Sequence, residues 1–119
     1  MIEVHLYLSP EKEERITGFD LEGHADSAPH GEDLVCCAVS TLATATVNAI
    51  REVAGLAQEA QIQAREGKLS LHLKRIQGSE NKRLADFSLQ VFQYNIDILA
   101  DQYPEYIHVT KRKDGSNEI

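Results

Sequence analysis

The sequence predicts an α+β domain in which two helices are combined with a mainly antiparallel sheet, in the order β-β-α-β-β-α-β. Short runs in which apolar and polar residues alternate are typical of half-buried strands. Two longer segments place apolar residues at steps of three and four, as amphipathic helices do. With 119 residues, 42% apolar and 26% charged, we expect residues 1–119 to form a single domain with a frayed tail from about residue 113.

The first part of the chain contains two predicted strands. Residues 2–8 alternate apolar Ile2, Val4, Leu6 and Leu8 with polar residues, and Pro10 ends this run. A second extended run covers about residues 15–25, where Asp20 and Glu22 stand at alternate positions and are expected to face water. A loop is predicted over residues 25–32. Pro29 and Gly31 within this loop, and Gly23 just before it, are residue types that interrupt regular secondary structure. We therefore expect the loop to be flexible.

The first helix is expected to begin after Asp33, which suits the N-cap position. Its predicted buried stripe consists of Val35, Val39, Leu42, Thr46, Ile50, Val53 and Ala57. The small residues of its middle part, 43–47, allow it to lie close to a sheet or a second helix. Residues 61–65 and 68–76 then form a predicted hairpin around Glu66-Gly67.

The second helix is expected to begin after Gly78-Ser79 and to stop before Pro104. Its predicted buried stripe is Leu84, Phe87, Val91, Tyr94 and Ile98, helped by Leu89, Phe92 and Leu99. An apolar surface this broad leaves room for a dimer contact. Residues 105–111 complete the sheet as its last predicted strand, and His5, His72 and His108 are expected to fill or edge that sheet.

The formal charge of −7 is concentrated at one end of the chain. Residues 1–33 hold nine acidic and two basic residues, whereas residues 34–119 hold ten of each. Such a surface repels phosphate backbones, which argues against nucleic-acid binding, and it attracts a basic peptide. The alternative interpretation is that the acidic surplus only keeps the protein soluble.

The longest uncharged stretch, Leu34 to Ile50, is shorter than the roughly 20 apolar residues that cross a bilayer. No apolar signal segment follows Met1. The sequence therefore predicts a cytoplasmic protein that does not bind a membrane.

The chemistry is expected where the second strand meets the first helix. Cys36 would occupy the third helical position, where free N–H groups and the positive end of the helix dipole favour thiolate over thiol. His24 ends the preceding strand, and the intervening loop can return it to the helix start. If the two side chains meet, they form a cysteine-histidine dyad for nucleophilic catalysis.

Other interpretations of these residues stay open. Cys37 is the second thiol, but one step along a helix turns its side chain by about 100°, so only one of the two cysteines can face His24. Both thiols are alternatively small packing residues. A metal site made of His24, His30, Cys36 and Cys37 is disfavoured because adjacent cysteines chelate one ion poorly, and a redox pair lacks the usual two-residue spacer. We expect neither a metal nor a cofactor.

Each of two polar residues near Cys36 in the sequence, Asp33 and Ser40, has two possible roles. Asp33 either caps the helix or orients His24, and the cap is favoured. Ser40 lies one turn beyond Cys36 and either supports the site or packs locally.

The segment from Gly23 to Ser40 resembles the signature of the bacterial ribosomal-processing cysteine proteases, the Prp family. The similarity rests on Gly23-His24-Ala25, Gly31, Asp33, Val35-Cys36 and Ala38-Val39-Ser40. The resemblance implies that Cys36 is the nucleophile and His24 its partner, with Asp33 and Ser40 as supporting positions. This chain departs from the family at Cys37, where alanine is usual.

The resemblance also implies a function. Such a protease removes the N-terminal extension of a large-subunit ribosomal protein, the bacterial twenty-seventh, and forms a homodimer. A basic ribosomal protein fits the acidic first part of this chain. The alternative is a noncatalytic ribosome-assembly adaptor, which would hold the same basic partner without cutting it.

Overall fold

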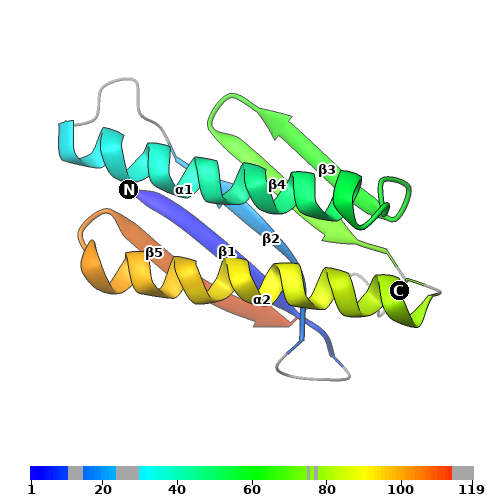
Figure 1. The fold of residues 1–119 in the computed structure, drawn as a ribbon. Coiled ribbons are helices and arrows are strands. Elements are labelled where there is room, and N and C mark those ends of the chain that lie inside the picture. The colour runs from blue at the N-terminus through cyan, green and yellow to red at the C-terminus, as the bar shows by residue number, and fades with distance from the viewer. Residues whose placement is uncertain (11–14, 24–29, 75, 77, 114–119) are drawn as a thin grey trace.

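The fold is a two-layer sandwich in which both helices cover one face of a five-stranded sheet (Figure 1). This computed structural model describes residues 1–10, 15–23, 30–74, 76 and 78–113. The strands are β1 (Ile2–Leu8), β2 (Ile16–Glu22), β3 (Ala60–Arg65), β4 (Lys68–Leu73) and β5 (Ile107–Lys113). The helices are α1 (His30–Asn48), which continues into the π-helical turn η1 (Ala49–Val53), and α2 (Ser79–Gln102).

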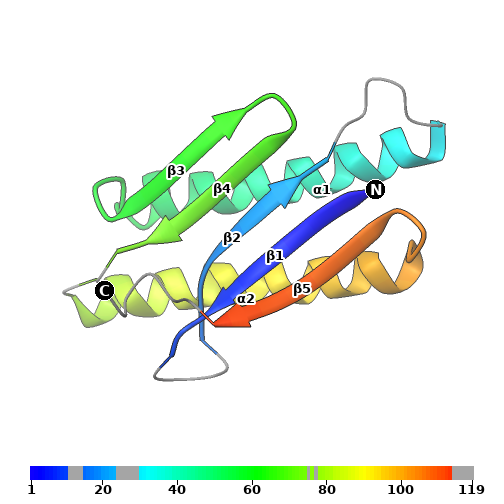
Figure 2. The ribbon, with the colours of Figure 1, turned by 180° about the vertical axis from the view of Figure 1, so that it is seen from behind.

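The sheet order is β3-β4-β2-β1-β5, which the view from behind shows without the helices in front (Figure 2). β1 pairs antiparallel with β2 and parallel with β5, and the remaining pairs are antiparallel. The predicted α+β class and element order are thus confirmed. Because β4 pairs with β2, the turn of the β3–β4 hairpin lies beside the end of β2, and this placement creates the site described below.

The core lies between the sheet and the helices. From β1, the alternate residues Ile2, Val4 and Leu6 are buried, as the period-two pattern predicted. Phe19 of β2 stacks on Phe92 of α2 with ring centroids 4.3 Å apart, and both side chains are fully buried. An ion pair from Arg15 to Asp86, at 2.9 Å, joins the start of β2 to the same helix.

The predicted buried stripe of α2 is wrong in its main members. Phe87, Val91, Tyr94 and Ile98 are exposed, and the core instead receives Ala85, Leu89, Phe92 and Ile96. The helix is apolar on two faces, and the face that carries Phe92 and the small Ala85 stacks on Phe19 and approaches the sheet closely. Leu89 and Phe92 were expected to contribute, and they do.

The predicted stripe of α1 is correct through Ile50 and wrong beyond it. Val53 and Ala57 are exposed, because the π-helical turn and Gly55 change the direction of the chain. The N–H of Ala54 donates to the carbonyl of Ala49 at 2.8 Å, and Gly55 then adopts a φ of 71°. Leu56 enters the core in place of the two predicted residues.

The apolar segment of α1 and η1 is longer than the uncharged stretch Leu34 to Ile50, because it continues past the charged Arg51 and Glu52. Leu34–Val53 spans 20 residues with a mean hydropathy of 1.4, so its length and composition would allow it to cross a membrane. In the fold, Val35, Val39, Ala43, Val47 and Ile50 are buried against the sheet and α2. The apolar character of α1 therefore serves the core of the domain.

Candidate active site

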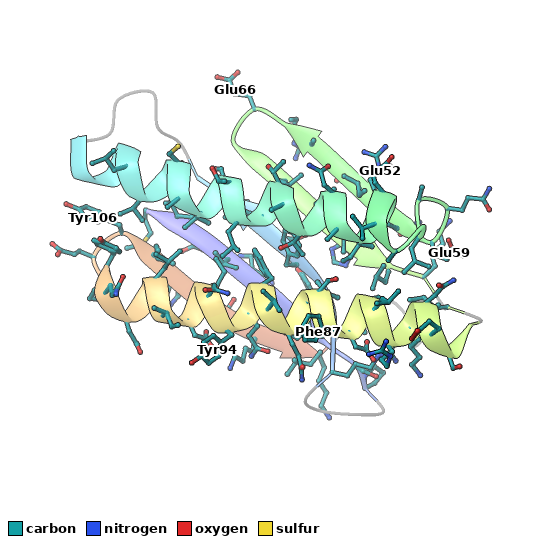
Figure 3. All side chains as sticks on the ribbon, in the orientation of Figure 1. Glu52, Glu59, Glu66, Phe87, Tyr94 and Tyr106 are labelled. Atoms are coloured by element: carbon teal, nitrogen blue, oxygen red, sulfur yellow. The ribbon has the colours of Figure 1, made fainter. Side chains whose placement is uncertain are left out.

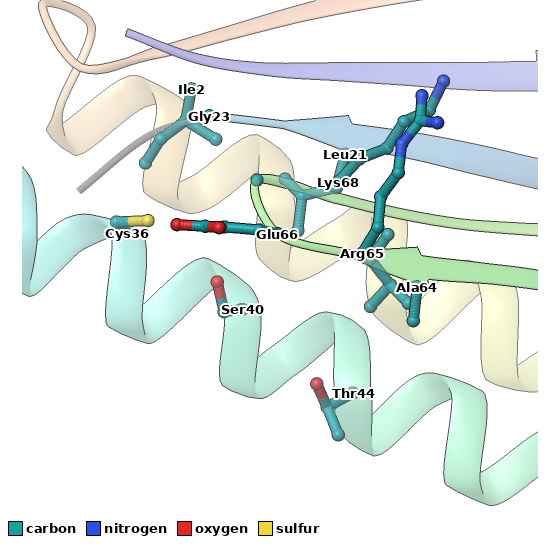
Figure 4. Close-up of a pocket in the computed structure, with 12 residues that line it drawn as sticks. Ile2, Leu21, Gly23, Cys36, Ser40, Thr44, Ala64, Arg65, Glu66 and Lys68 are labelled. Carbon is teal, nitrogen blue, oxygen red and sulfur yellow. The ribbon is translucent and has the colours of Figure 1, made fainter. Parts of the chain in front are cut away.

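A cleft of about 370 Å³ opens between α1 and the β3–β4 hairpin. Its floor contains Ile2, Leu21 and Leu69, and Gly23 closes the end at which β2 stops. Figure 3 shows Glu66 at the tip of the β3–β4 hairpin, and Figure 4 shows the residues that line the cleft. It is the place where helix, sheet and hairpin turn meet.

The helical wall of the cleft presents Cys36, Ser40 and Thr44. These residues follow one another at steps of four, so they stand above one another on one helix face. The Cys36 side chain is partly exposed and points toward the hairpin turn (Figure 4). A thiol that is accessible in a cleft and followed by hydroxyls along its wall has the placement that a nucleophile requires.

Cys37 has a different environment. It is exposed and does not line the cleft, as expected for a residue about 100° further round the helix. Its backbone carbonyl accepts a hydrogen bond of 2.8 Å from the Thr41 hydroxyl, a bond within one helical turn. Its thiol thus reaches solvent outside the cleft.

The opposite wall is the hairpin turn, and a hydrogen bond holds it in place. The N–H of Gly23 donates to the carbonyl of Gly67 at 3.0 Å, which ties the turn to the end of β2. Gly67 has a φ of 77°, a conformation that is strained for residues with a Cβ. Glu66, the residue before Gly67, also lines the cleft at this turn (Figure 4).

The helix begins four residues earlier than predicted, at His30 rather than at Leu34 after Asp33. Asp33 is therefore its fourth residue and not its N-cap. Glu32 and Asp33 both lie in the first turn, where the positive end of the helix dipole favours acidic residues. Cys36 becomes the seventh helical residue, about 9 Å along the axis, beyond the turn in which that dipole acts.

The predicted loop over residues 25–32 is corrected at its end, because Gly31 lies within α1. Gly23 follows directly on β2 and lines the cleft. His24 and Pro29 lie outside the residues that the structure describes. Gly23, the residue before His24, thus marks where the chain leaves the sheet, at the Cys36 end of the cleft.

A second polar cluster occupies the sheet face that the helices leave open. The Tyr7 hydroxyl donates to Asp20 Oδ2 at 2.7 Å, and His72 Nε2 lies 2.9 Å from Asp20 Oδ1. Burial, followed by the hydrogen bond and charge of Asp20, raises the pKa of Tyr7 to about 12. Burial raises the pKa of Asp20, but the hydrogen bonds from Tyr7 and His72 outweigh it and bring that pKa below its usual value. The cluster lies across the sheet from the cleft.

The predicted positions of the three strand histidines can now be stated. His5, His72 and His108 all lie on the open sheet face, where His5 contacts Thr110 and His108 lies 3.4 Å from Glu3. Within the described part of the chain, no group of three His, Cys, Asp or Glu residues is placed to hold a metal ion.

Sequence reasoning named only Gly23, Cys36 and Ser40 as site residues among those that line the cleft, and it missed Thr44, Glu66 and Gly67 among others. The spacing of Thr44 from Cys36 and Ser40 is a signal in the sequence that predicts a shared helix face. Glu66-Gly67 was predicted as a turn, but its place in the wall of the cleft depends on the pairing of β4 with β2, which periodicity does not give.

The fold and the cleft, with one thiol opening into it from a helix, define a small hydrolase of the cysteine-nucleophile class. Comparison with protein families gives the particular family. Residues 1–108 match the family model of the cysteine protease Prp, and the chain therefore belongs to that family.

Relatives agree with this assignment. The ribosomal processing cysteine protease Prp of Bacillus subtilis (strain 168) is 26% identical over 95 residues, which cover 80% of this chain and 85% of the relative. A crystal structure of a Streptococcus mutans protein is 26% identical with a TM-score of 0.73, and the match covers 96% of both chains.

The essential ribosomal processing protease Prp of Staphylococcus aureus has been solved with a substrate peptide. That structure is 25% identical to this chain, with a TM-score of 0.75 over 93% of this chain and 99% of the other. The same protein has also been solved with a covalently linked product peptide, at 26% identity and a TM-score of 0.72.

Proposed function

We propose that this protein is a cysteine endopeptidase that removes the N-terminal extension of a large-subunit ribosomal protein, the bacterial twenty-seventh, during ribosome maturation. The observation that carries the proposal is the opening of Cys36 into a cleft shaped by α1 and the hairpin, in a chain of the Prp family. The substrate and product complexes of the S. aureus relative support a peptide as the occupant of this cleft. The acidic first part of the chain supports a basic protein as its source.

In the proposed mechanism, His24 takes the thiol proton of Cys36. The sulfur then attacks the peptide carbonyl, and a C–S bond forms while the carbonyl oxygen becomes an oxyanion. As the C–N bond breaks, His24 gives its proton to the departing amine. Water then breaks the C–S bond of the thioester and releases the acid and the free thiol. Backbone N–H donors at the oxyanion typically contribute about 3 kcal/mol to such a step.

The observed start of α1 changes the roles within this mechanism. Because Cys36 lies beyond the first helical turn, the helix dipole contributes little, and we assign thiolate stabilisation to the imidazolium of His24. Asp33 lies inside α1 rather than at its N-cap, and we assign to it the alternative role of orienting His24. Ser40, the next residue along the cleft wall, is assigned a supporting role at the substrate.

Incubation of the ribosomal protein precursor with the enzyme, followed by mass spectrometry, tests partner and reaction together. We expect one cut at the extension junction, and losses of at least about a thousandfold in kcat/KM for Cys36→Ala and His24→Ala. Cys37→Ser is the matched control and retains activity. Full activity of Cys36→Ala, or a loss confined to Cys37→Ser, contradicts the assignment. Stoichiometric binding without any cleavage by the unmutated protein would favour the adaptor.

We further propose that the enzyme acts as a homodimer through the exposed face of α2. Phe87 and Tyr94 are 63% and 70% exposed, and Val91 and Ile98 continue the same apolar stripe. The neighbouring residues Gln90, Gln93 and Asn95 are uncharged, and Asp97 is the one charged residue among the described residues that line this surface, so two copies of this face meet with little charge repulsion. Tyr94→Asp is expected to shift the sedimentation of the protein from dimer to monomer, and Glu105→Lys, off this face, is the control. Equal sedimentation of the wild type and Tyr94→Asp would refute the interface.

The setting of the reaction is part of the proposal. A ribosomal substrate is met in the cytoplasm, and the enzyme is proposed to act there without binding nucleic acid or a membrane. The net charge of −7 supports the first exclusion, because it removes the counterion-release contribution to nucleic-acid binding. The burial of one face of α1 against the sheet supports the second.

A further inference from the structure

The sheet ends in two edge strands of different character, β3 on one side and β5 on the other (Figure 2). The last three residues of β5 are Lys111, Arg112 and Lys113, and such charged side chains discourage another strand from pairing with an edge. β3 lacks this protection. Its residues 60–64 contain no charged residue and no proline, and β3 pairs with β4 without a shift in register. β3 is therefore the edge of this sheet that can accept a further strand.

A hydrogen bond at the open end of the hairpin shows which backbone groups of β3 are used by β4. The N–H of Lys74 donates to the carbonyl of Glu59 at 2.8 Å, and these two residues are the next pair beyond the β3–β4 register. In an antiparallel ladder, hydrogen-bonded pairs alternate with non-hydrogen-bonded pairs. Every second residue after Glu59 therefore directs its N–H and C=O toward β4, which applies to Gln61, Gln63 and Arg65.

The residues between these three direct the same groups away from the sheet. The N–H of Ala60 is already bonded, because it donates to the carbonyl of Leu56 at 3.0 Å. Ile62 and Ala64 each present an N–H and a C=O for which no hydrogen-bond partner lies in the part of the chain that the structure describes. Because the two residues are separated by one position, their free groups follow the two-residue repeat of an extended peptide.

The free edge of β3 is continuous with the cleft. Ala64 and Arg65, the last residues of the strand, line the cleft together with Gly67 of the hairpin turn. Cys36 lines the same cleft from α1. A peptide that leaves the cleft at the hairpin thus reaches β3 at Ala64, and from there the edge continues for about 13 Å to Ala60, which is the length of about four extended residues.

We propose that the free edge of β3 binds an extended segment of the substrate, on one side of the scissile bond, as an added β-strand. This inference rests on the proposed protease function and names a second place at which the same substrate is held. The backbone groups of Ile62 and Ala64 supply the hydrogen bonds, so the edge recognises an extended backbone rather than a particular side chain. These bonds are equally strong before and during the reaction, so they lower KM and leave kcat unchanged.

A proline substitution tests the edge, because proline removes an outward N–H and leaves the bonds to β4 in place. Ala64→Val adds similar bulk but keeps the N–H, and it is the reference. For a peptide that spans the extension junction, Ala64→Pro is expected to have a KM about fivefold above that of Ala64→Val, with the same kcat. Lys111→Pro, at an outward position of the β5 edge, is the matched control with wild-type constants. Equal KM values for Ala64→Pro and Ala64→Val overturn the proposal.

Amide hydrogen exchange locates the peptide with the β3 strand unaltered. It is measured by NMR in Cys36→Ala, which holds the peptide without cutting it. The N–H groups of Ile62 and Ala64 are expected to exchange rapidly in the free protein and at least about tenfold more slowly with saturating peptide, whereas those of Gln61 and Gln63 exchange slowly in both states. If the wild type cleaves the peptide but exchange at Ile62 and Ala64 stays rapid, the edge proposal is overturned and the protease function stands.

The remaining outcomes separate the two proposals and the two occupants. Binding of the peptide without cleavage by the wild type, with Ile62 and Ala64 protected, refutes the protease function and supports strand addition at the edge. A peptide that is neither bound nor cleaved refutes both. Sedimentation of the free protein is expected to be the same for the wild type and Ala64→Pro. A smaller mass for Ala64→Pro would show that the edge pairs with a second copy of this chain, and the proposal would be overturned.

Discussion

The contact between β2 and β4 allows a strict test of the fold, because Gly18 has no room for a side chain. A Cβ at this position would lie 2.4 Å from the Leu71 carbonyl oxygen and 3.0 Å from two atoms of His72. The first of these atoms belongs to the backbone of the paired strand, which sheet hydrogen bonding holds at a fixed spacing. We therefore expect Gly18→Ala to lower the free energy of unfolding by about 3 kcal/mol, at the upper end of overpacking costs.

Two further glycines serve as controls that separate the effect of a steric clash from the effect of a strained backbone conformation. Gly55→Ala meets no atom within 4 Å but must adopt a φ of 71°, which costs about 1 kcal/mol. Gly78→Ala meets only ordinary contacts from 3.7 Å outward and is expected to cost a few tenths of a kcal/mol. Urea unfolding followed by circular dichroism measures all three. The reasoning is refuted if Gly18→Ala proves less destabilising than Gly55→Ala.

The remaining predictions concern the core and the open sheet face. Phe92→Ala is expected to cost about 4 kcal/mol in urea unfolding because it removes a fully buried ring stacked on Phe19. For Phe87→Ala we expect less than about 0.5 kcal/mol in a monomeric background, since its ring is exposed. The pKa of Tyr7 is raised from 10.0 to about 12, so its contribution to the free energy of unfolding is fully present below pH 10 and is lost as pH rises toward 12. Urea unfolding measured as a function of pH should show a smaller loss of stability over this range in Tyr7→Phe. The lowered pKa of Asp20 predicts the opposite sign, with stability lost as pH falls below the usual value of 3.8, and Asp20→Asn should weaken that acid loss.

Periodicity predicted the elements of this chain better than it predicted the faces they bury. In β1 the two agree, because a strand that is apolar on one side can bury only that side. In α2 the apolar residues surround much of the helix, and two sets satisfy the same spacing rule. The choice was made by a partner outside the helix, Phe19, which stacks on Phe92. The spacing of apolar residues within α2 carries no information about which residue of the sheet this helix contacts.

The ends of α1 show what local signals add. The acidic Glu32 and Asp33 indicate an early first turn as well as a cap, and the structure takes the first option. At the other end, the π-helical turn shifts the phase of the stripe after Ile50, so residues that continue the pattern in sequence leave it in space. This shift depends on the path of the chain from η1 to Leu56 and β3. The spacing of apolar residues carries no information about that path.

The cleft combines a part that sequence could reveal with a part that only topology supplies. Cys36 and Ser40 share a wall because they are four residues apart on a helix, which the sequence states directly. The hairpin turn forms the opposite wall because β4 pairs with β2 and because the N–H of Gly23 donates to the Gly67 carbonyl. Gly23 thus fixes the hairpin turn and also begins the segment that carries His24. Under the proposed mechanism, one glycine at the end of β2 therefore fixes a wall of the cleft and directly precedes the histidine that activates the thiol.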